Sequence, residues 1–161
     1  MAEQTRELTL TRVFDAPREL VWRAWTEPEL MAKWWGPNGV TNPTCELDAK
    51  VGGKMYIVML ADETLGPLAG QRWPMRGEFQ EVQEPERLVF KNQAVDENDH
   101  VLIDGLTTVT FEEEGGKTKM TMTTVAKAMA PPAPQMLDGM EAGWTQSLEK
   151  LGELVAERSL V

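Results

Sequence analysis

The stretch that decides the fold is MLDGMEAGWTQSLEKLGELVAER, which runs from Met136 to Arg158 near the C-terminus. Its apolar residues recur at steps of three and four, and this spacing predicts a long helix with a single apolar stripe. Such a helix is stable only when another element covers the stripe. The stripe consists of Leu137, Met140, Trp144, Leu148, Leu151 and Val155.

The residues before this helix have the pattern of an antiparallel sheet. Apolar and polar side chains alternate along short segments, and turns rich in glycine and proline separate them. A sheet that covers one long helix curves into a cup, and such cups often enclose a cavity. The predicted strands are Glu7–Phe14, Thr41–Leu47, Lys54–Ala61, Pro74–Val82, Arg87–Val95, Leu106–Glu112 and Lys117–Lys127.

Two short helices are predicted between the first two strands. The first covers Pro17–Trp25, where proline suits the opening turn. Thr26 and Glu29 have the spacing of a capping box, which predicts that a second helix starts there and ends before Gly36. Residues 1–161 therefore predict one domain of the α+β class. We expect a curved antiparallel sheet of about six to seven strands wrapped around the C-terminal helix.

Alternation along the strands separates an apolar inner face from a polar outer face. The inner face is rich in methionine, whose flexible side chain can line pockets that accept varied ligands. Large rings at the centre of a cup can also stack on a flat ligand. The predicted cavity-lining residues are Trp34, Met55, Ile57, Met59, Met75, Phe79, Phe90, Asn92, Met120, Met122, Met140 and Trp144.

Polar side chains that could orient a ligand in this apolar interior are few, as is usual in small-molecule pockets. They are Tyr56, Arg76, Glu81, Asn92 and Thr124, although alternation places Arg76 on the outer face. The strand Lys54–Ala61 also carries apolar residues on its second face. That face predicts either cover on both sides of the strand or a contact between two copies of the chain in a homodimer.

Charge and composition narrow the classes of partner. The chain has a formal net charge of −10, which argues against binding to nucleic acid or to an anionic membrane surface. No run of about 18 apolar residues is present, and the N-terminus lacks the pattern of a signal peptide. The single cysteine, Cys45, cannot form an internal disulfide, which suits a reducing compartment. We therefore expect a cytoplasmic protein.

Chemistry-bearing motifs are sparse. His100 is the single histidine and lies in an acidic turn, so the spacings of a metal site are missing. Gly52 and Gly53 lack the following helix and the Lys-Ser/Thr pair of a phosphate-binding loop, and they predict a turn or bulge. We predict no metal ion, no cofactor and no catalytic residue.

Five phrases of the sequence, taken in order, resemble one known family: the activator of heat-shock-protein-90 ATPase homologue family. That family belongs to the START-like superfamily, which has the helix-grip fold of the Bet v allergens and includes SRPBCC-like polyketide cyclases. The resemblance spans residues 8 to 157. The phrases are Val13 to Pro17 with Val21 to Trp25; Leu30 to Pro37; Asp48 to Gly53; Gly77 to Val82 with Pro85; and Gly143 to Leu151.

The resemblance implies an incomplete antiparallel sheet around the C-terminal helix, with a hydrophobic tunnel between them. It also implies binding of a small hydrophobic or aromatic molecule, since superfamily members bind lipids, sterols and polyketides. Two alternatives stay open: a cyclase or hydrolase acting on a hydrophobic substrate in the same cavity, and a co-chaperone-like interaction domain. The family's eukaryotic co-chaperone carries a separate N-terminal domain that is missing from these 161 residues, so a chaperone partner is not the expected one.

Overall fold

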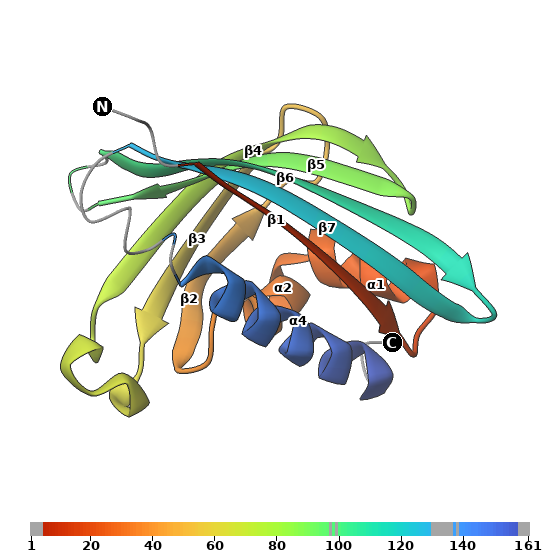
Figure 1. The fold of residues 1–161 in the computed structure, drawn as a ribbon, viewed down its shortest axis with the longest axis horizontal. Coiled ribbons are helices and arrows are strands. Elements are labelled where there is room, and N and C mark those ends of the chain that lie inside the picture. The colour runs from red at the N-terminus through yellow and green to blue at the C-terminus, as the bar shows by residue number, and fades with distance from the viewer. Residues whose placement is uncertain (1–4, 97, 99, 130–136, 138, 158–161) are drawn as a thin grey trace.

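The structure is a computed structural model that describes residues 5–96, 98, 100–129, 137 and 139–157. Strands and helices follow in the predicted order (Figure 1). The elements are β1 (Thr5–Phe14), α1 (Arg18–Thr26), α2 (Pro28–Trp34), β2 (Val40–Leu47), β3 (Lys54–Ala61), the 3-10 helix η1 (Glu63–Leu68), β4 (Arg72–Gln83), β5 (Arg87–Val95), β6 (Val101–Glu114), β7 (Lys117–Ala128) and α4 (Met140–Glu157).

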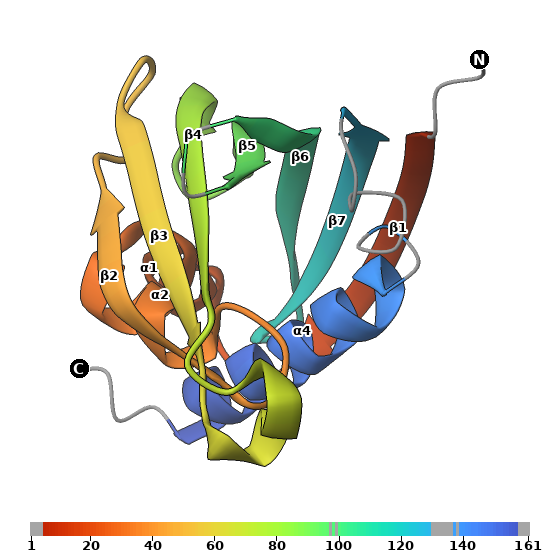
Figure 2. The same ribbon diagram turned by 90° about the vertical axis from the view of Figure 1, so that its left-hand side faces the viewer.

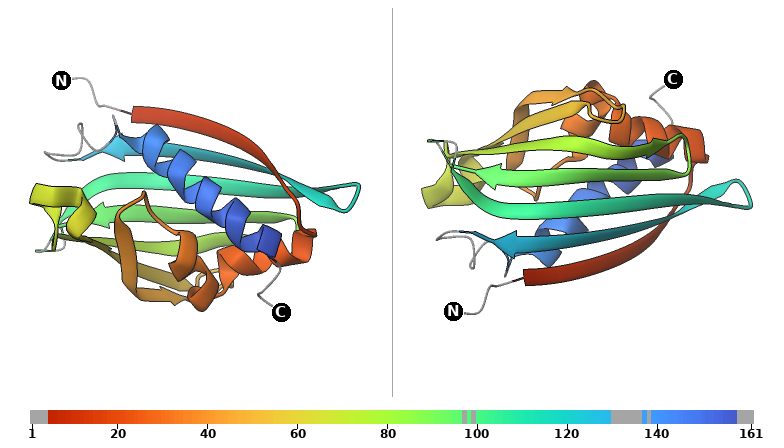
Figure 3. Two further views of the ribbon diagram at one scale, coloured as in Figure 1. Left: turned by 90° about the horizontal axis from the view of Figure 1, so that it is seen from below. Right: turned by 90° about the horizontal axis from the view of Figure 1, so that it is seen from above.

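The seven strands form one antiparallel sheet in the order β1-β7-β6-β5-β4-β3-β2. Strands β2 to β7 each pair with the next along the chain, and β1 joins the far edge beside β7. The sheet curves over the long helix, and α1, α2 and α4 all lie on its concave side (Figures 2 and 3). The predicted α+β class and curved sheet around a C-terminal helix are confirmed.

Helix α4 lies against α2, β1 and α1 and crosses the concave face diagonally (Figure 3). Its second half is sealed, because Leu148, Leu151 and Val155 are buried. Its first half is less covered, since Met140 and Trp144 are only half-buried. The predicted ends at Met136 and Arg158 lie outside the described residues. The helix therefore packs tightly at one end of the cup and loosely at the other.

Burial confirms the predicted inner face of the sheet. The inward positions of β3, β4, β5, β6 and β7 are almost all apolar, which drives the sheet to close over the helices. A bulge between Phe79 and Glu81 shifts the alternation near the end of β4. The buried inner-face residues include Met55, Ile57, Met75, Phe79, Leu88, Phe90, Val109, Phe111, Met120 and Met122.

The start of the second helix differs from the prediction. Thr26 does not cap it, because its Oγ1 donates a hydrogen bond of 2.9 Å to the carbonyl of Trp22 and so closes α1. Helix α2 begins instead at Pro28, with Glu27 before it and no side-chain cap. Proline fixes the backbone at this position, which is enough to start the helix without a capping box.

The apolar second face of β3 is only partly covered. Val58 is 7% exposed, whereas Tyr56 is 40% exposed. A dimer contact through this face stays a prediction. Within the described part of the chain, no helix has both the length and the apolar character needed to cross a bilayer.

Candidate functional site

A tryptophan cluster forms the floor of the cup, where α1, α2 and α4 meet. The ring of Trp25 lies 4.7 Å from that of Trp34 and 6.3 Å from that of Trp144, the second pair being stacked at 20°. Trp35 meets Trp144 edge-on at 5.3 Å. These contacts join three helices through their largest side chains.

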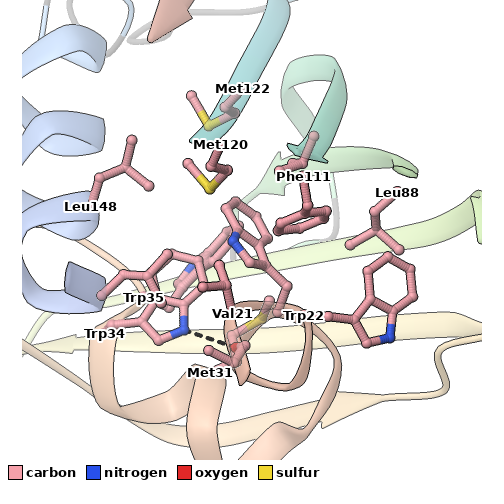
Figure 4. Packing of buried hydrophobic residues seen from close by; sticks show 14 of the residues in the cluster. Val21, Trp22, Met31, Trp34, Trp35, Leu88, Phe111, Met120, Met122 and Leu148 are labelled. Carbon is pink, nitrogen blue, oxygen red and sulfur yellow. Dashed lines mark hydrogen bonds between the residues drawn. The ribbon is translucent and has the colours of Figure 1, made fainter. Parts of the chain in front are cut away.

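Trp34 and Trp35 both belong to this floor although they are adjacent in sequence. The indole Nε1 of Trp34 donates a hydrogen bond of 2.9 Å to the carbonyl of Ala24, which ties α2 to α1 (Figure 4). Trp35 follows the last helical residue and has an extended backbone, with φ −63° and ψ 133°. The end of the helix therefore turns both rings inward, and both are buried.

Above this floor, side chains fill the end of the cup beside the second half of α4. We call this the closed end. Leu148 of α4 projects toward Met120 and Met122 of β7, as Figure 4 shows. Phe90 packs between Trp25 at 6.2 Å and Phe79 at 6.1 Å. Most of the predicted lining residues lie in this buried cluster, namely Trp34, Met55, Ile57, Met75, Phe79, Phe90, Met120 and Met122. Their direct contact with a ligand stays a prediction.

The other end of the cup is less sealed, and we call it the open end. It is marked by five half-buried residues whose positions face inward. The sheet contributes Met59, Trp73 and Asn92, and the first half of α4 contributes Met140 and Trp144. Four of these five are the remaining predicted lining residues, and the fifth, Trp73, was not singled out by the sequence pattern.

One row across the inner face combines small residues with an amide. In the strand register, Gly77 of β4 is opposite Asn92 of β5, which is opposite Gly105 of β6, which is opposite Ala126 of β7. A Cβ on Gly105 would lie 3.0 Å from Nδ2 and 3.2 Å from Oδ1 of Asn92. The amide therefore lies against Gly105, and a glycine at this position makes room for it.

Asn92 belongs to a polar triad with Thr107 and Thr124 on the same face. The hydroxyl of Thr107 donates a hydrogen bond of 2.9 Å to Oδ1 of Asn92. The hydroxyl oxygens of Thr107 and Thr124 are 2.9 Å apart. Because Thr107 has one proton and gives it to Asn92, Thr124 is the donor in the second bond. Both threonines are at most 1% exposed, so these bonds replace water in the interior.

Sequence patterns anticipated part of this triad. Asn92 and Thr124 were expected to face inward, and they do. Thr107 was not identified, although it follows the same alternation as Val109 and Phe111 on its strand. Of the other polar candidates, Arg76 bonds to Gln93 and Glu81 bonds to Arg87, both on the outer face.

Two contacts hold α4 beside the loop that follows α2. Gln146 accepts a hydrogen bond of 2.8 Å from the backbone of Asn38, and Lys150 donates one of 3.3 Å to the carbonyl of Pro37. Burial lowers the pKa of Lys150 below its usual range. These two bonds fix the middle of α4 to the loop. The two halves of the helix still differ in how closely their side chains are packed.

The residues considered for chemistry from the sequence lie in turns between strands. His100 contacts Asp96 at 3.3 Å in an exposed turn. Gly52 and Gly53 form the predicted turn, which bonds to Phe79 on the neighbouring strand. Among the residues that the structure describes, no three acidic, histidine or cysteine side chains gather as metal ligands.

Burial raises the pKa of the Cys45 thiol to about 11, and the nearby charges of Glu29 and Glu46 add to this effect. Near pH 8 the reactive thiolate is then roughly a hundredfold scarcer than in a free cysteine, whose pKa is about 8.5. We expect disulfide reagents to modify Cys45 about a hundred times more slowly than they modify N-acetylcysteine, with a rate that keeps rising up to about pH 11. The urea-unfolded protein provides the control and is expected to react at the free-thiol rate. A rate plateau near pH 9 would contradict this assignment.

Comparison with known proteins places this arrangement in a family. The family profile described as Activator of Hsp90 ATPase homolog 1-like protein matches residues 15–156. The chain belongs to the AHSA1-like family. A comparison with curated proteins found no match.

Solved structures share the AHSA1-like fold over nearly the whole chain. A Chromobacterium violaceum protein is 29% identical, with a TM-score of 0.76 over 92% of this chain and 96% of its own. An Arthrobacter aurescens protein is 25% identical, with a TM-score of 0.78 over 94% of this chain and 86% of its own. An AHSA1 protein from Silicibacter pomeroyi is 24% identical, with a TM-score of 0.73 over 95% and 99%. This AHSA1-like chain therefore has the SRPBCC, or helix-grip, fold.

Proposed function

We propose that this AHSA1-like protein binds a small, mainly apolar molecule at the open end of the cup. The observation that carries the proposal is the change in packing along α4. Its second half is sealed in the core, whereas Met140 and Trp144 in its first half stay half-buried. Apolar surface of this kind gains free energy when a ligand covers it.

The expected affinity follows from the area that is covered. A ligand that removes about 200 Å² of apolar surface from water gains roughly 5 kcal/mol before the entropy cost of association. The ring of Trp144 offers a flat face at this position, and Met59 and Met140 offer flexible side chains that adapt to shape. These features favour modest affinity for small hydrophobic or aromatic molecules. The proposal has the protein act in the cytoplasm, as its single cysteine suggests.

The inner wall favours binding over catalysis. The inward positions of strands β3 to β7, all of which the structure describes, carry a single Asp, Glu, His, Lys or Arg side chain, that of Glu113, and it is exposed near the end of β6. A cyclase or hydrolase acting there would need a positioned acid or base from another element. A chaperone partner would use the outer surface rather than the open end.

Titration with N-phenyl-1-naphthylamine, a neutral apolar fluorophore, tests the proposal. We expect a saturable rise in fluorescence, and we expect Trp144→Ala to weaken binding about tenfold because it removes most of a large apolar contact. Val51→Ala is the matched control, since Val51 is 68% exposed and lies in the turn between β2 and β3. The absence of saturation, or equal weakening by both variants, would exclude the open end as the binding site.

A further inference from the structure

We propose that Asn92 anchors the ligand through its side-chain N–H, and that the ligand is an uncharged apolar molecule carrying a hydrogen-bond acceptor such as a carbonyl oxygen. This inference rests on the proposed function, because it assigns the chemistry of the same site. Three features carry it: the orientation of the amide, the free donor that results, and the lack of charge around it.

The polar triad fixes which end of the amide faces the ligand. Oδ1 of Asn92 accepts the proton of Thr107, and Thr107 in turn accepts from Thr124. These two hydrogen bonds use the single proton of each hydroxyl group. The hydrogen-bonding needs of both hydroxyls are therefore met when Oδ1 is turned toward Thr107. The triad therefore holds Asn92 in one orientation without using its N–H groups. Thr107 and Thr124 are positioning residues in this arrangement.

The amide nitrogen is left with donors and no acceptor. Among the described residues, no hydrogen bond satisfies Nδ2 of Asn92, and the sealed polar atoms without a partner are Trp25 Nε1 and Asn42 Oδ1. Nδ2 therefore keeps some exposure to solvent, and it lies against Gly105 on the inner face. Burial of apolar surface alone would hold a ligand in any orientation. A single amide donor in a mostly apolar wall fixes one orientation through a hydrogen bond.

The nearest neighbours of Asn92 on the inner face carry no charge. Its row continues through Gly77 on one side and through Gly105 and Ala126 on the other, and Arg6 follows Ala126 only on the edge strand β1. On its own strand the adjacent inward residues are Ala94 and Phe90. No inward cation on β3 to β7 could balance a carboxylate or phosphate, and an unpaired charge in such a place is costly. A neutral acceptor meets the donor without that cost.

The test compares benzophenone with diphenylmethane, two neutral probes of similar shape that differ in one carbonyl group. Each displaces N-phenyl-1-naphthylamine in competition. We expect wild-type protein to prefer benzophenone about fivefold to tenfold, the value of one hydrogen bond to a neutral acceptor. Asn92→Leu keeps the side-chain size and removes the donor. It is expected to abolish the preference while changing diphenylmethane affinity less than about twofold. Diphenylacetate is expected to bind at least about tenfold more weakly than benzophenone.

Thr107→Val provides a second readout that does not depend on Asn92→Leu folding. It keeps the shape of the side chain but frees the amide to rotate, so we expect a reduced preference for benzophenone with circular dichroism unchanged. Equal affinity of wild-type protein for the two neutral probes would overturn the inference and leave the proposed function standing. A preference for benzophenone that survives both substitutions would also overturn it. A failure of N-phenyl-1-naphthylamine itself to bind would instead refute the proposed function.

Discussion

Replacement of Trp25 by alanine is expected to lower the free energy of unfolding by about 3–5 kcal/mol, the range seen when large aromatic side chains are removed from cores. Trp25 is 0% exposed. Its ring contacts Trp34 from α2, Phe90 from the sheet and Trp144 from α4. One substitution therefore removes a contact to three separate elements. Urea denaturation followed by circular dichroism measures the change.

Trp25→Phe separates the ring from its polar group. The indole Nε1 of Trp25 is buried and has no hydrogen-bond partner among the described residues. Phenylalanine retains an aromatic ring and removes that unsatisfied donor, whose burial costs about 1–3 kcal/mol. We therefore expect Trp25→Phe to destabilise the protein by less than about 2 kcal/mol, because removal of the unsatisfied donor partly offsets the packing that the smaller ring loses. Near-native stability of Trp25→Ala would show that this ring does not join the three elements.

Gly53→Ala is expected to destabilise the protein by about 3 kcal/mol or more, because the new methyl group has no space. A Cβ on Gly53 would lie 1.8 Å from the backbone oxygen of Asp48, an atom that cannot move without the chain. The same turn is bonded to β4, since the N–H of Phe79 donates to the Gly53 carbonyl at 2.9 Å. Relief of the clash would break this link. Thermal unfolding and urea melts measure the loss.

Gly116→Ala is the matched control for that substitution. Gly116 has a positive φ of 85° in the turn between β6 and β7, and a Cβ there would meet open space. Alanine at this position carries only the strain of a left-handed backbone, about 1–2 kcal/mol. A larger loss for Gly116→Ala than for Gly53→Ala would contradict the steric explanation.

Local periodicity was enough to predict most of the fold. The apolar stripe on α4 and the apolar inner face of the sheet each need another surface to cover them. In the structure the sheet and the helix cover each other. The inner positions of β3 to β7 followed from alternation, apart from the shifts at the bulge in β4 and at the end of β5. Burial of Phe79, Phe90, Met120 and Met122 confirms this. The family resemblance added an incomplete sheet around the C-terminal helix, whereas the order of the strands was not predicted.

Other features depend on three-dimensional contacts that no local pattern contains. The predicted capping box at Thr26 was wrong because the hydroxyl of Thr26 donates a hydrogen bond to the carbonyl of Trp22 in the preceding helix. The role of Thr107 depends on its side-chain hydrogen bonds to both neighbouring strands, to Thr124 directly opposite it and to Asn92 on the diagonal. The diagonal course of α4, which leaves Met140 and Trp144 half-buried, is set by its contacts with α2 and β1.

The most direct test of the central claim is methyl NMR of protein labelled with ¹³C at the methionine methyl groups, titrated with N-phenyl-1-naphthylamine. Met59 and Met140 lie at the open end, whereas Met31 and Met120 are fully buried in the core. We expect large, saturable shifts for Met59 and Met140 and much smaller ones for Met31 and Met120. Shifts confined to the exposed Met129, or no saturable shift at Met59 and Met140, would contradict binding at the open end.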